Sequence, residues 1–191
     1  MQSLWDSGAT ALTVSELVDL VLNGGQVPPR AVVITFDDGN RDVAEQAFPI
    51  MQEFGFRGTV YLIANALNAS TNLSIDQLQP LIAAGWEIGS HSMTHADLVK
   101  SGRSLNTEIC QSKTRLETAL QVEIRSFAYP FGVATPYIEN YVRDCGYASG
   151  AGLGTYNRHT IAGIYSFSRR EVRGDMDLSA FNSLMPWSTA P

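Results

Sequence analysis

The feature that most limits the possible folds is a regular alternation of short apolar runs with longer amphipathic stretches. The run 31–36 is nearly all apolar and rich in β-branched residues, which predicts a strand buried on both faces. A second run of this kind, 59–63, predicts another strand. Strands that alternate with helices indicate βα units and a parallel sheet. Further strands are expected over 86–90, 126–129, 147–151 and 165–172.

Two capping boxes indicate where helices begin. Thr13 with Glu16 predicts a helix from residue 14 to about residue 22, and Ser74 with Gln77 predicts one that ends near residue 84. A helix is also expected over 41–54, where Pro49 can bend or interrupt it. The remaining helices are expected over 103–120, 136–144 and 178–184.

Polar side chains follow several of the predicted strands directly. Asp37 and Asp38 come after the first strand, His91 follows the 86–90 strand, and Tyr129 ends the 126–129 strand. Catalytic groups at the carboxyl ends of several strands are typical of a (β/α) barrel. Periodicity alone leaves a doubly wound open sheet as the alternative. The 191 residues fit one domain, so we expect a single α/β domain over 1–191.

The bulk composition excludes some classes of protein. The 13 basic and 19 acidic residues give a net charge of −6, which argues against a nucleic-acid-binding protein. No transmembrane segment and no signal peptide are visible. We expect the two cysteines, Cys110 and Cys145, to be buried free thiols, with a single disulfide as the alternative. Composition leaves the oligomeric state open.

Two short segments carry residues suited to metal chemistry. The adjacent carboxylates Asp37 and Asp38 repel each other, so the pair is costly unless a cation lies nearby. On its own, this segment is more typical of a turn that caps a helix. His91 and His95 lie four residues apart, so both rings can point at one position. Two histidines with one carboxylate bind a metal and leave coordination positions open, as a hydrolytic site requires.

A third segment makes the combination specific. Arg125, Pro130 and Gly132 would alone indicate only a surface cation and a turn. Together, the three segments resemble the polysaccharide deacetylases, also called NodB-homology domains or carbohydrate esterase family 4. The family patterns T-F-D-D-G, H-S/T-x-x-H and R-x-x-x-x-P-x-G are matched at 35–39, 91–95 and 125–132, in that order.

The resemblance extends from about Leu12 to Leu184 and is greatest to the poly-N-acetylglucosamine deacetylase-like branch. It implies a distorted (β/α) barrel of the polysaccharide deacetylase type. Whether the barrel is incomplete at both ends stays open. It also implies that Asp38, His91 and His95 bind a divalent metal, usually Zn²⁺. Cobalt and nickel suit the same nitrogen and oxygen ligands.

The resemblance further implies the roles of three other residues. Asp37 would be the general base, Arg125 its partner, and the backbone N–H of Tyr129 a donor to the oxyanion. The chemistry agrees, because a metal acidifies its bound water and a neighbouring carboxylate can take the proton. One amide donor stabilises an oxyanion by roughly 3–4 kcal/mol.

Residues on the substrate side are less clearly marked. The segment 169–172 resembles a late family element that would place Arg169 facing the site. Tyr129, Phe131 and Trp187 are candidates for stacking on a sugar ring, although core packing explains Phe131 equally well. Trp86 is expected in the core, because it opens a predicted strand.

The family's general acid has no clear counterpart in this sequence. Neither the late L-x-H motif nor the early Tyr-His pair of the family is present, and the chain begins after the position of that pair. His159 is the only other histidine, and we expect a surface loop residue, with a replacement acid as the less favoured hypothesis.

The leading hypothesis is a metal-dependent hydrolase that removes N-acetyl groups from an N-acetylglucosamine-containing polysaccharide. An O-acetyl esterase or a cyclic-amide hydrolase of the same fold is the first alternative. An inactive glycan-binding relative, or a truncated fragment, is the second, because the acid is absent. The resemblance suggests a secreted or cell-envelope protein that acts in carbohydrate metabolism.

Overall fold

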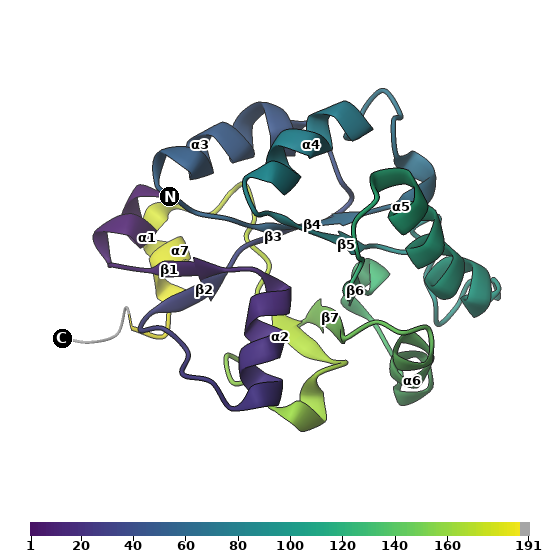
Figure 1. Ribbon diagram of the computed structural model, residues 1–191. Coiled ribbons are helices and arrows are strands. Elements are labelled where there is room, and N and C mark those ends of the chain that lie inside the picture. The colour runs from purple at the N-terminus through teal and green to yellow at the C-terminus, as the bar shows by residue number, and fades with distance from the viewer. Residues whose placement is uncertain (188–191) are drawn as a thin grey trace.

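A curved parallel sheet of six strands forms the centre of the computed structural model, which describes residues 1–187 (Figure 1). The strands lie in the order β3-β4-β5-β6-β7-β8, and each pairs in parallel with its neighbours. The curled sheet is a half-barrel with β3 and β8 at its edges, which confirms the predicted distorted barrel. Its strands are β3 (Thr35–Phe36), β4 (Thr59–Leu62), β5 (Glu87–Ser90), β6 (Ser126–Ala128), β7 (Ser149–Leu153) and β8 (Phe167–Arg169).

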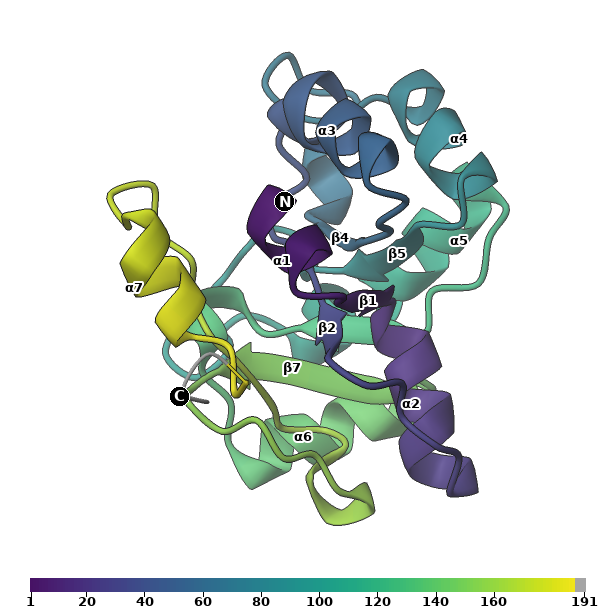
Figure 2. The same ribbon diagram turned by 90° about the vertical axis from the view of Figure 1, so that its left-hand side faces the viewer.

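A second, two-stranded sheet pairs β1 (Thr10–Leu12) with β2 (Ala31–Val33). The α-helices are α1 (Gln2–Asp6), α2 (Val14–Asn23), α3 (Phe48–Glu53), α4 (Ile75–Ala83), α5 (Ser112–Leu120), α6 (Pro136–Asp144) and α7 (Leu178–Ser183). Helices α1 and α7 come from opposite ends of the sequence and lie side by side (Figures 1 and 2), where Ser3 Oγ donates a hydrogen bond to Asn182 Oδ1 (2.5 Å). None of the helices in 1–187 combines the length and apolar character needed to cross a membrane.

The two capping boxes begin helices where the sequence predicts them. The Thr13 side chain accepts a hydrogen bond from the backbone N–H of Glu16, whose carboxylate accepts one from the N–H of Thr13. Ser74 and Gln77 form the same reciprocal pair at the start of α4. Gly24 ends α2 in the left-handed conformation (φ 69°), which glycine adopts without a side-chain clash.

Both faces of the sheet are covered, as parallel sheets require. Along β4, Val60 and Leu62 belong to the large core under α3, α4, α5 and α6. Tyr61, which lies between them, points to the other face and belongs to a smaller core with Val14 and Val18 of α2. Helix α2 therefore covers the inner face of the half-barrel, opposite the helices of the outer face (Figure 2).

The predicted strand 31–36 differs from expectation in two ways. It is divided at Ile34 into β2, which pairs with β1, and β3, which pairs with β4. All six residues are half-buried, so the predicted burial on both faces is wrong. The reason is position: β3 is an edge strand of the large sheet. Strand β1 and helix α1 were not predicted from the sequence.

Two of the predicted helices begin with a wider turn. The 41–54 stretch contains a π-helix, η1 (Val43–Ala47), followed by α3, and the 103–120 stretch contains a π-helix, η3 (Asn106–Gln111), followed by α5. Pro49 lies in the first turn of α3, where its missing N–H costs least. Such wide turns appear mostly as single-turn insertions in α-helices, and they are frequent at functional sites.

The two cysteines form a disulfide, so the expectation of free thiols is wrong. Cys110 on η3 bonds to Cys145, the residue that follows α6, with a Cα–Cα distance of 5.0 Å. This distance lies within the ordinary range for disulfides. The bridge ties together two segments 35 residues apart in sequence. Composition alone did not reveal it, because a single pair of cysteines has no spacing pattern that indicates pairing.

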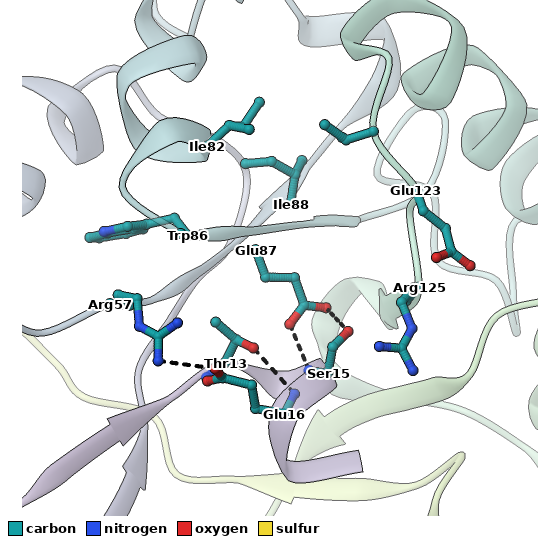
Figure 3. A pocket seen from close by; sticks show the side chains of 12 residues that line it. Thr13, Ser15, Glu16, Arg57, Ile82, Trp86, Glu87, Ile88, Glu123 and Arg125 are labelled. Atoms are coloured by element: carbon teal, nitrogen blue, oxygen red, sulfur yellow. Dashed lines mark hydrogen bonds and ion pairs between the residues drawn. The ribbon is translucent and has the colours of Figure 1, made fainter. Parts of the chain in front are cut away.

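The amino-terminal end of the half-barrel is closed by a polar cluster around Glu87, at the start of β5 (Figure 3). The Glu87 carboxylate accepts hydrogen bonds from Ser15 N (2.7 Å) and Ser15 Oγ (2.9 Å). It also accepts them from Ser126 Oγ (2.6 Å) and Thr59 Oγ1 (3.3 Å). A carboxylate at the first turn of α2 is also favoured by the helix dipole. Glu87 thereby fastens α2 to three strands of the sheet.

Candidate active site

The predicted site residues gather at the carboxyl-end edge of the sheet. Asp37 and Asp38 follow β3 directly, and His91 follows β5. Arg169 is the last residue of β8, and Phe131 lies in the turn after β6. Because the strands are parallel, their carboxyl ends lie at one edge. Residues more than 130 positions apart are in contact there, since Arg169 and Asp37 are separated by 132.

The three predicted metal ligands lie together. Asp38, His91 and His95 each offer one ligand atom, and these atoms lie within 4.8 Å of one another. Asp38 Oδ1 lies 3.6 Å from His91 Nε2 and 3.4 Å from His95 Nε2. This oxygen is buried and accepts no hydrogen bond from any residue of 1–187. An unpaired buried carboxylate oxygen is costly, and a divalent cation would stabilise it, so the side chains present fit a metal ion.

His91 is oriented as a ligand should be. Its side chain is 2% exposed, and its Nδ1 lies 2.8 Å from the carbonyl oxygen of Ala128. A carbonyl only accepts, so Nδ1 carries the hydrogen and Nε2 presents a lone pair to Asp38 and His95. Burial lowers the pKa of His91 despite the nearby aspartates, which keeps the ring neutral. A neutral ring with a second nitrogen held by a carbonyl is the usual state of a metal-binding histidine.

The backbone is strained at this edge of the sheet. Asp38 (φ 69°), Ser92 (φ 67°), His95 (φ 60°) and Phe131 (φ 60°) all adopt the left-handed conformation. Each such non-glycine residue costs roughly 1–2 kcal/mol. Strain of this kind persists only where the surrounding structure holds it, and it concentrates at functional sites. The conformation aims Asp38 and His95 at each other across two loops.

Asp37 is held by Arg169 through two hydrogen bonds. Arg169 Nη1 donates to Asp37 Oδ1 (2.6 Å), and Nη2 donates to Oδ2 (2.9 Å). Burial raises the pKa of the Asp37 carboxyl, but the hydrogen bonds and charge of Arg169 outweigh burial and lower this pKa below its ordinary value. Asp37 is therefore ionised at neutral pH. The same guanidinium donates to Thr35 Oγ1 (3.1 Å), so it joins β8 to β3 across the open side of the half-barrel.

The predicted pairing of Arg125 with Asp37 is wrong. Arg125 precedes β6, at the opposite end of the sheet, and donates two hydrogen bonds to Asp19 of α2 (2.6 and 3.0 Å). The residue that contacts Asp37 is Arg169, which was predicted to face the site only as a substrate contact. A role for Arg169 in substrate binding stays a prediction.

The predicted roles of Tyr129 are also contradicted. Its backbone N–H donates to the carbonyl of Ala151 (2.9 Å) in the β6–β7 pairing, so it is not available to an oxyanion. Its side chain is 1% exposed, and its hydroxyl donates to the carbonyl of Tyr165 (2.7 Å). A buried ring cannot stack on a sugar. Tyr129 is therefore a core residue beneath the site.

The next amide along the chain is that of Phe131, because Pro130 has no N–H. The Phe131 N–H donates none of the hydrogen bonds described for this turn within 1–187. The Phe131 ring is 58% exposed and meets the His95 ring edge-on, with the centroids 4.7 Å apart. The ring of Phe131 was predicted to face the site and its amide was not, although Pro130 was a signal for the amide.

The remaining aromatic candidates differ in position. Trp86 is 4% exposed and stacks on Phe36, with the centroids 5.7 Å apart, which confirms the expected core role. Trp187 is half-buried in the turn after α7, and its contact with a sugar stays a prediction. His159 lies edge-on against Phe167, with the centroids 4.8 Å apart, in the segment that precedes β8. No contact described in 1–187 joins His159 to Asp37 or Asp38, so nothing supports the replacement-acid hypothesis.

The fold and this site define a half-barrel protein with a carboxylate–histidine cluster at the carboxyl ends of its strands. The family model described as "Polysaccharide deacetylase" matches residues 24–150. This chain therefore belongs to the polysaccharide deacetylase family.

Individual proteins similar to this chain agree with that assignment. The chain is 24% identical over 184 residues to "Putative polysaccharide deacetylase YxkH" of Bacillus subtilis, which covers 96% of the chain and 66% of that protein. It is 29% identical over 141 residues to a poly-beta-1,6-N-acetyl-D-glucosamine N-deacetylase of Staphylococcus epidermidis, covering 65% of the chain and 48% of that protein. The chain thus spans less than two thirds of the length of these relatives.

A solved structure shows the same fold. The Streptococcus pyogenes deacetylase PplD, in complex with acetate, superposes with a TM-score of 0.85 at 23% identity. The match covers 96% of this chain and 83% of that one.

Proposed function

We propose that this chain is a metal-dependent hydrolase that removes N-acetyl groups from an N-acetylglucosamine-containing polysaccharide. The observation that carries the proposal is the contrast between two adjacent carboxylates. Asp37 is fully paired with Arg169, whereas Asp38 directs an unpaired oxygen at two histidines. The resemblance to a poly-N-acetylglucosamine deacetylase supports the substrate class.

Asp38, His91 and His95 would hold the metal, and their nitrogen and oxygen atoms suit Zn²⁺. When bound, such an ion supplies Lewis-acid polarisation of the acyl carbonyl and a water nucleophile near neutral pH. Three protein ligands leave coordination positions for substrate and water. The neutral ring of His91 can bind without first losing a proton.

Asp37 is the general base of the proposal. Its Oδ2 lies 3.8 Å from His91 Nε2, so the carboxylate borders the same space as the metal ligands without being one of them. Arg169 keeps it ionised and fixes its orientation. An ionised carboxylate in this position can take a proton from water as that water attacks the acetamide carbonyl.

The backbone N–H of Phe131 replaces that of Tyr129 as the proposed oxyanion donor. It is the first amide after Pro130. The backbone of Phe131 is left-handed, and its ring lies against the ring of His95. An amide that needs no reorganisation stabilises the charge that develops on the carbonyl oxygen. The exposed Phe131 ring beside it offers an apolar surface to a sugar face.

An O-acetyl esterase is the second candidate, and a specific observation favours it. The chain has 3 histidines, two belong to the metal cluster, and the third lies against Phe167. An amine must be protonated before it leaves, whereas an alcohol departs from an ester more readily. Within the described residues no third histidine contacts the cluster, and an ester depends on such an acid less than an amide does.

Acetate release decides between these candidates. The protein is stripped with a chelator, reloaded with Zn²⁺, and assayed on β-1,6-linked N-acetylglucosamine oligomers and on acetylated xylan. We expect zinc-dependent release from the amide substrate. Release from xylan alone would establish the esterase instead. A protein that binds zinc and the oligomer but releases no acetate would be an inactive glycan-binding relative.

We also propose that the protein works outside the cytoplasm, in the secreted or cell-envelope setting of the family. The support is the Cys110–Cys145 disulfide, because disulfides persist mainly in oxidising compartments. Alkylation of the native protein before and after reduction tests this. Protein from its natural source should react with thiol reagents only after reduction, and free thiols in that sample would contradict the proposal.

A further inference from the structure

Glu108 is a buried carboxylate that the proposed chemistry does not use. It lies on the π-helix η3 and is 1% exposed. Its Oε2 accepts a hydrogen bond from the backbone N–H of Thr94 (2.9 Å), and its Oε1 accepts one from the Thr94 hydroxyl (2.7 Å). Nη1 of Arg103, an exposed side chain, lies 3.8 Å from Glu108 Oε1. A buried carboxylate is costly to keep, so its retention at this position needs a reason.

Thr94 belongs to the loop that carries both histidine ligands. Within this loop, 91–95, Ser92 and His95 adopt the left-handed conformation, and the N–H of His95 donates to Ser92 Oγ (2.9 Å). His95 follows Thr94 directly, so the position of Thr94 fixes the backbone from which the His95 side chain extends.

The loop is held from two sides. On one side, the amides of Ala64 and Asn65 donate to the carbonyls of Ser92 and Met93 (both 3.0 Å). On the other side, Glu108 holds Thr94 with its carboxylate, and its own carbonyl accepts from the N–H of Met93 (3.0 Å). Within 1–187, Glu108 supplies the only side chain from outside the loop that hydrogen-bonds to the backbone of 91–95.

The segment that carries Glu108 is itself fixed. The turn η3 is wider than an α-helix and continues into α5, and Cys110, two residues after Glu108, is tied to the end of α6 by the disulfide. Side chains that orient metal ligands work only when they are themselves held in place. The disulfide and α5 meet this requirement for Glu108.

We propose that Glu108 is a positioning residue for the metal site: it holds Thr94 so that the His95 ring reaches Asp38. This inference rests on the metal binding proposed above. No contact described in 1–187 joins the Glu108 side chain to a proposed metal ligand, so it acts through the loop. A carboxylate is suited to this task, because its two oxygens accept the backbone and hydroxyl hydrogens of one residue at the same time.

The test compares metal affinity and metal geometry in three variants. Glu108→Ala removes both hydrogen bonds, Glu108→Gln keeps the shape and one acceptor oxygen, and Glu87→Ala removes a matched carboxylate at the opposite end of the sheet. Zn²⁺ affinity of the stripped protein is measured by competition with a chromogenic chelator. The visible absorption of bound Co²⁺ reports ligand geometry independently of activity.

We expect Glu108→Ala to bind Zn²⁺ about 10- to 100-fold more weakly and to change the Co²⁺ spectrum. Glu108→Gln should recover most of the affinity and the spectrum, and Glu87→Ala should leave both unchanged. Wild-type affinity and spectrum in a folded Glu108→Ala protein would overturn the inference while leaving the metal site intact. If the wild type itself binds no Zn²⁺, the proposed metal site fails, and this inference fails with it.

Thr94→Val decides the question if Glu108→Ala does not fold. This substitution keeps the shape and the backbone N–H of residue 94 but removes the hydroxyl donor to Glu108. We expect a several-fold weaker Zn²⁺ affinity and a shifted Co²⁺ spectrum. An unchanged affinity and spectrum would overturn the inference.

Discussion

The two ends of the half-barrel each hold carboxylates, and the two groups are treated in opposite ways. At the amino-terminal end, Glu87 accepts four hydrogen bonds from the backbone and hydroxyls of its neighbours. At the carboxyl end, Asp38 keeps a buried oxygen to which no described residue donates, within 3.6 Å of two histidine nitrogens. A satisfied carboxylate stabilises the fold, whereas an unsatisfied one next to potential ligands is available for binding.

The backbone conformation also differs between the two ends of the half-barrel. The residues that hold Glu87 lie in ordinary strands and at a standard helix start. Asp38, His95 and Phe131 at the other end are all in the left-handed conformation. Four of the seven left-handed non-glycine residues in the described part of the chain thus lie where side chains must be aimed at a shared point. The comparison predicts that substitutions at the carboxyl end alter activity and those at the amino-terminal end alter stability.

The largest expected effect is on turnover in Asp37→Asn. The substitution removes the proposed base while keeping the side-chain shape, so kcat for acetate release should fall about 10²- to 10⁴-fold. Zn²⁺ affinity should change little, because Asp37 is not among the proposed ligands. Rates are expressed per folded molecule, since the bond to Arg169 is weakened as well. Loss of Zn²⁺ binding in this variant would show that Asp37, and not Asp38 alone, is a ligand.

Glu87→Ala tests the opposite end. Removing this carboxylate leaves Ser15 N–H and the hydroxyls around it without an acceptor, so the free energy of unfolding should fall by about 1–3 kcal/mol. Urea denaturation followed by circular dichroism measures the loss. The folded fraction should retain wild-type kcat. A large fall in kcat without a fall in stability would break the comparison.

Tyr129→Phe sharpens the comparison, because Tyr129 lies at the active end but has a structural role. The carbonyl of Tyr165 loses its hydroxyl donor, so the free energy of unfolding should fall by about 1 kcal/mol. The kcat should stay at the wild-type value, since the proposed oxyanion donor is the amide of Phe131. A selective loss of kcat would restore a catalytic role to Tyr129. The matched variant Tyr147→Phe also loses a buried hydroxyl bond, to the carbonyl of Ile109 (2.9 Å).

The smallest effect is expected at the Asp19–Arg125 pair. Both side chains are partly exposed (47% and 32%), so Asp19→Asn should change the free energy of unfolding by less than about 1 kcal/mol. Hydrogen bonds from Arg125 lower the pKa of Asp19, so the pair stabilises the fold above the ordinary aspartate pKa of about 3.9.

This contribution is lost as the pH falls through the lowered pKa of the folded state. Urea denaturation of wild type and Asp19→Asn between pH 6 and pH 2 should therefore show a difference that shrinks at the acid end. Arg125→Met should leave kcat unchanged. A fall in kcat of the size expected for Asp37→Asn would return Arg125 to the catalytic site.

Local patterns predicted the parts of the fold that depend on neighbours in sequence. Both capping boxes begin helices as expected, because their hydrogen bonds span only three residues. The resemblance implied the cluster of Asp38, His91 and His95, and the structure brings these residues together because the two histidines share one loop and Asp38 follows a strand of the same sheet. The division of 31–36 was not predictable, because it depends on which strand lies beside each half.

The rest of the site was harder to predict, because it depends on pairing between residues far apart in sequence. Two arginines stood near plausible site segments, and nothing local distinguishes a partner of Asp37 from a partner of Asp19. The choice follows from the end of the strand: Arg125 precedes β6, whereas Arg169 ends β8. Cys110 and Cys145 pose the same difficulty, because the contact between η3 and the end of α6 exists only in the folded chain.

The bond from Arg169 to Asp37 and Thr35 has a consequence for the evolution and engineering of this protein. The half-barrel has one open side, and the guanidinium that spans it also holds the proposed base. A substitution of Arg169 changes stability and catalysis together, so neither property can be selected independently at this position. Substitutions around Glu87 are instead expected to change stability without changing activity, because that end of the sheet lies away from the chemistry.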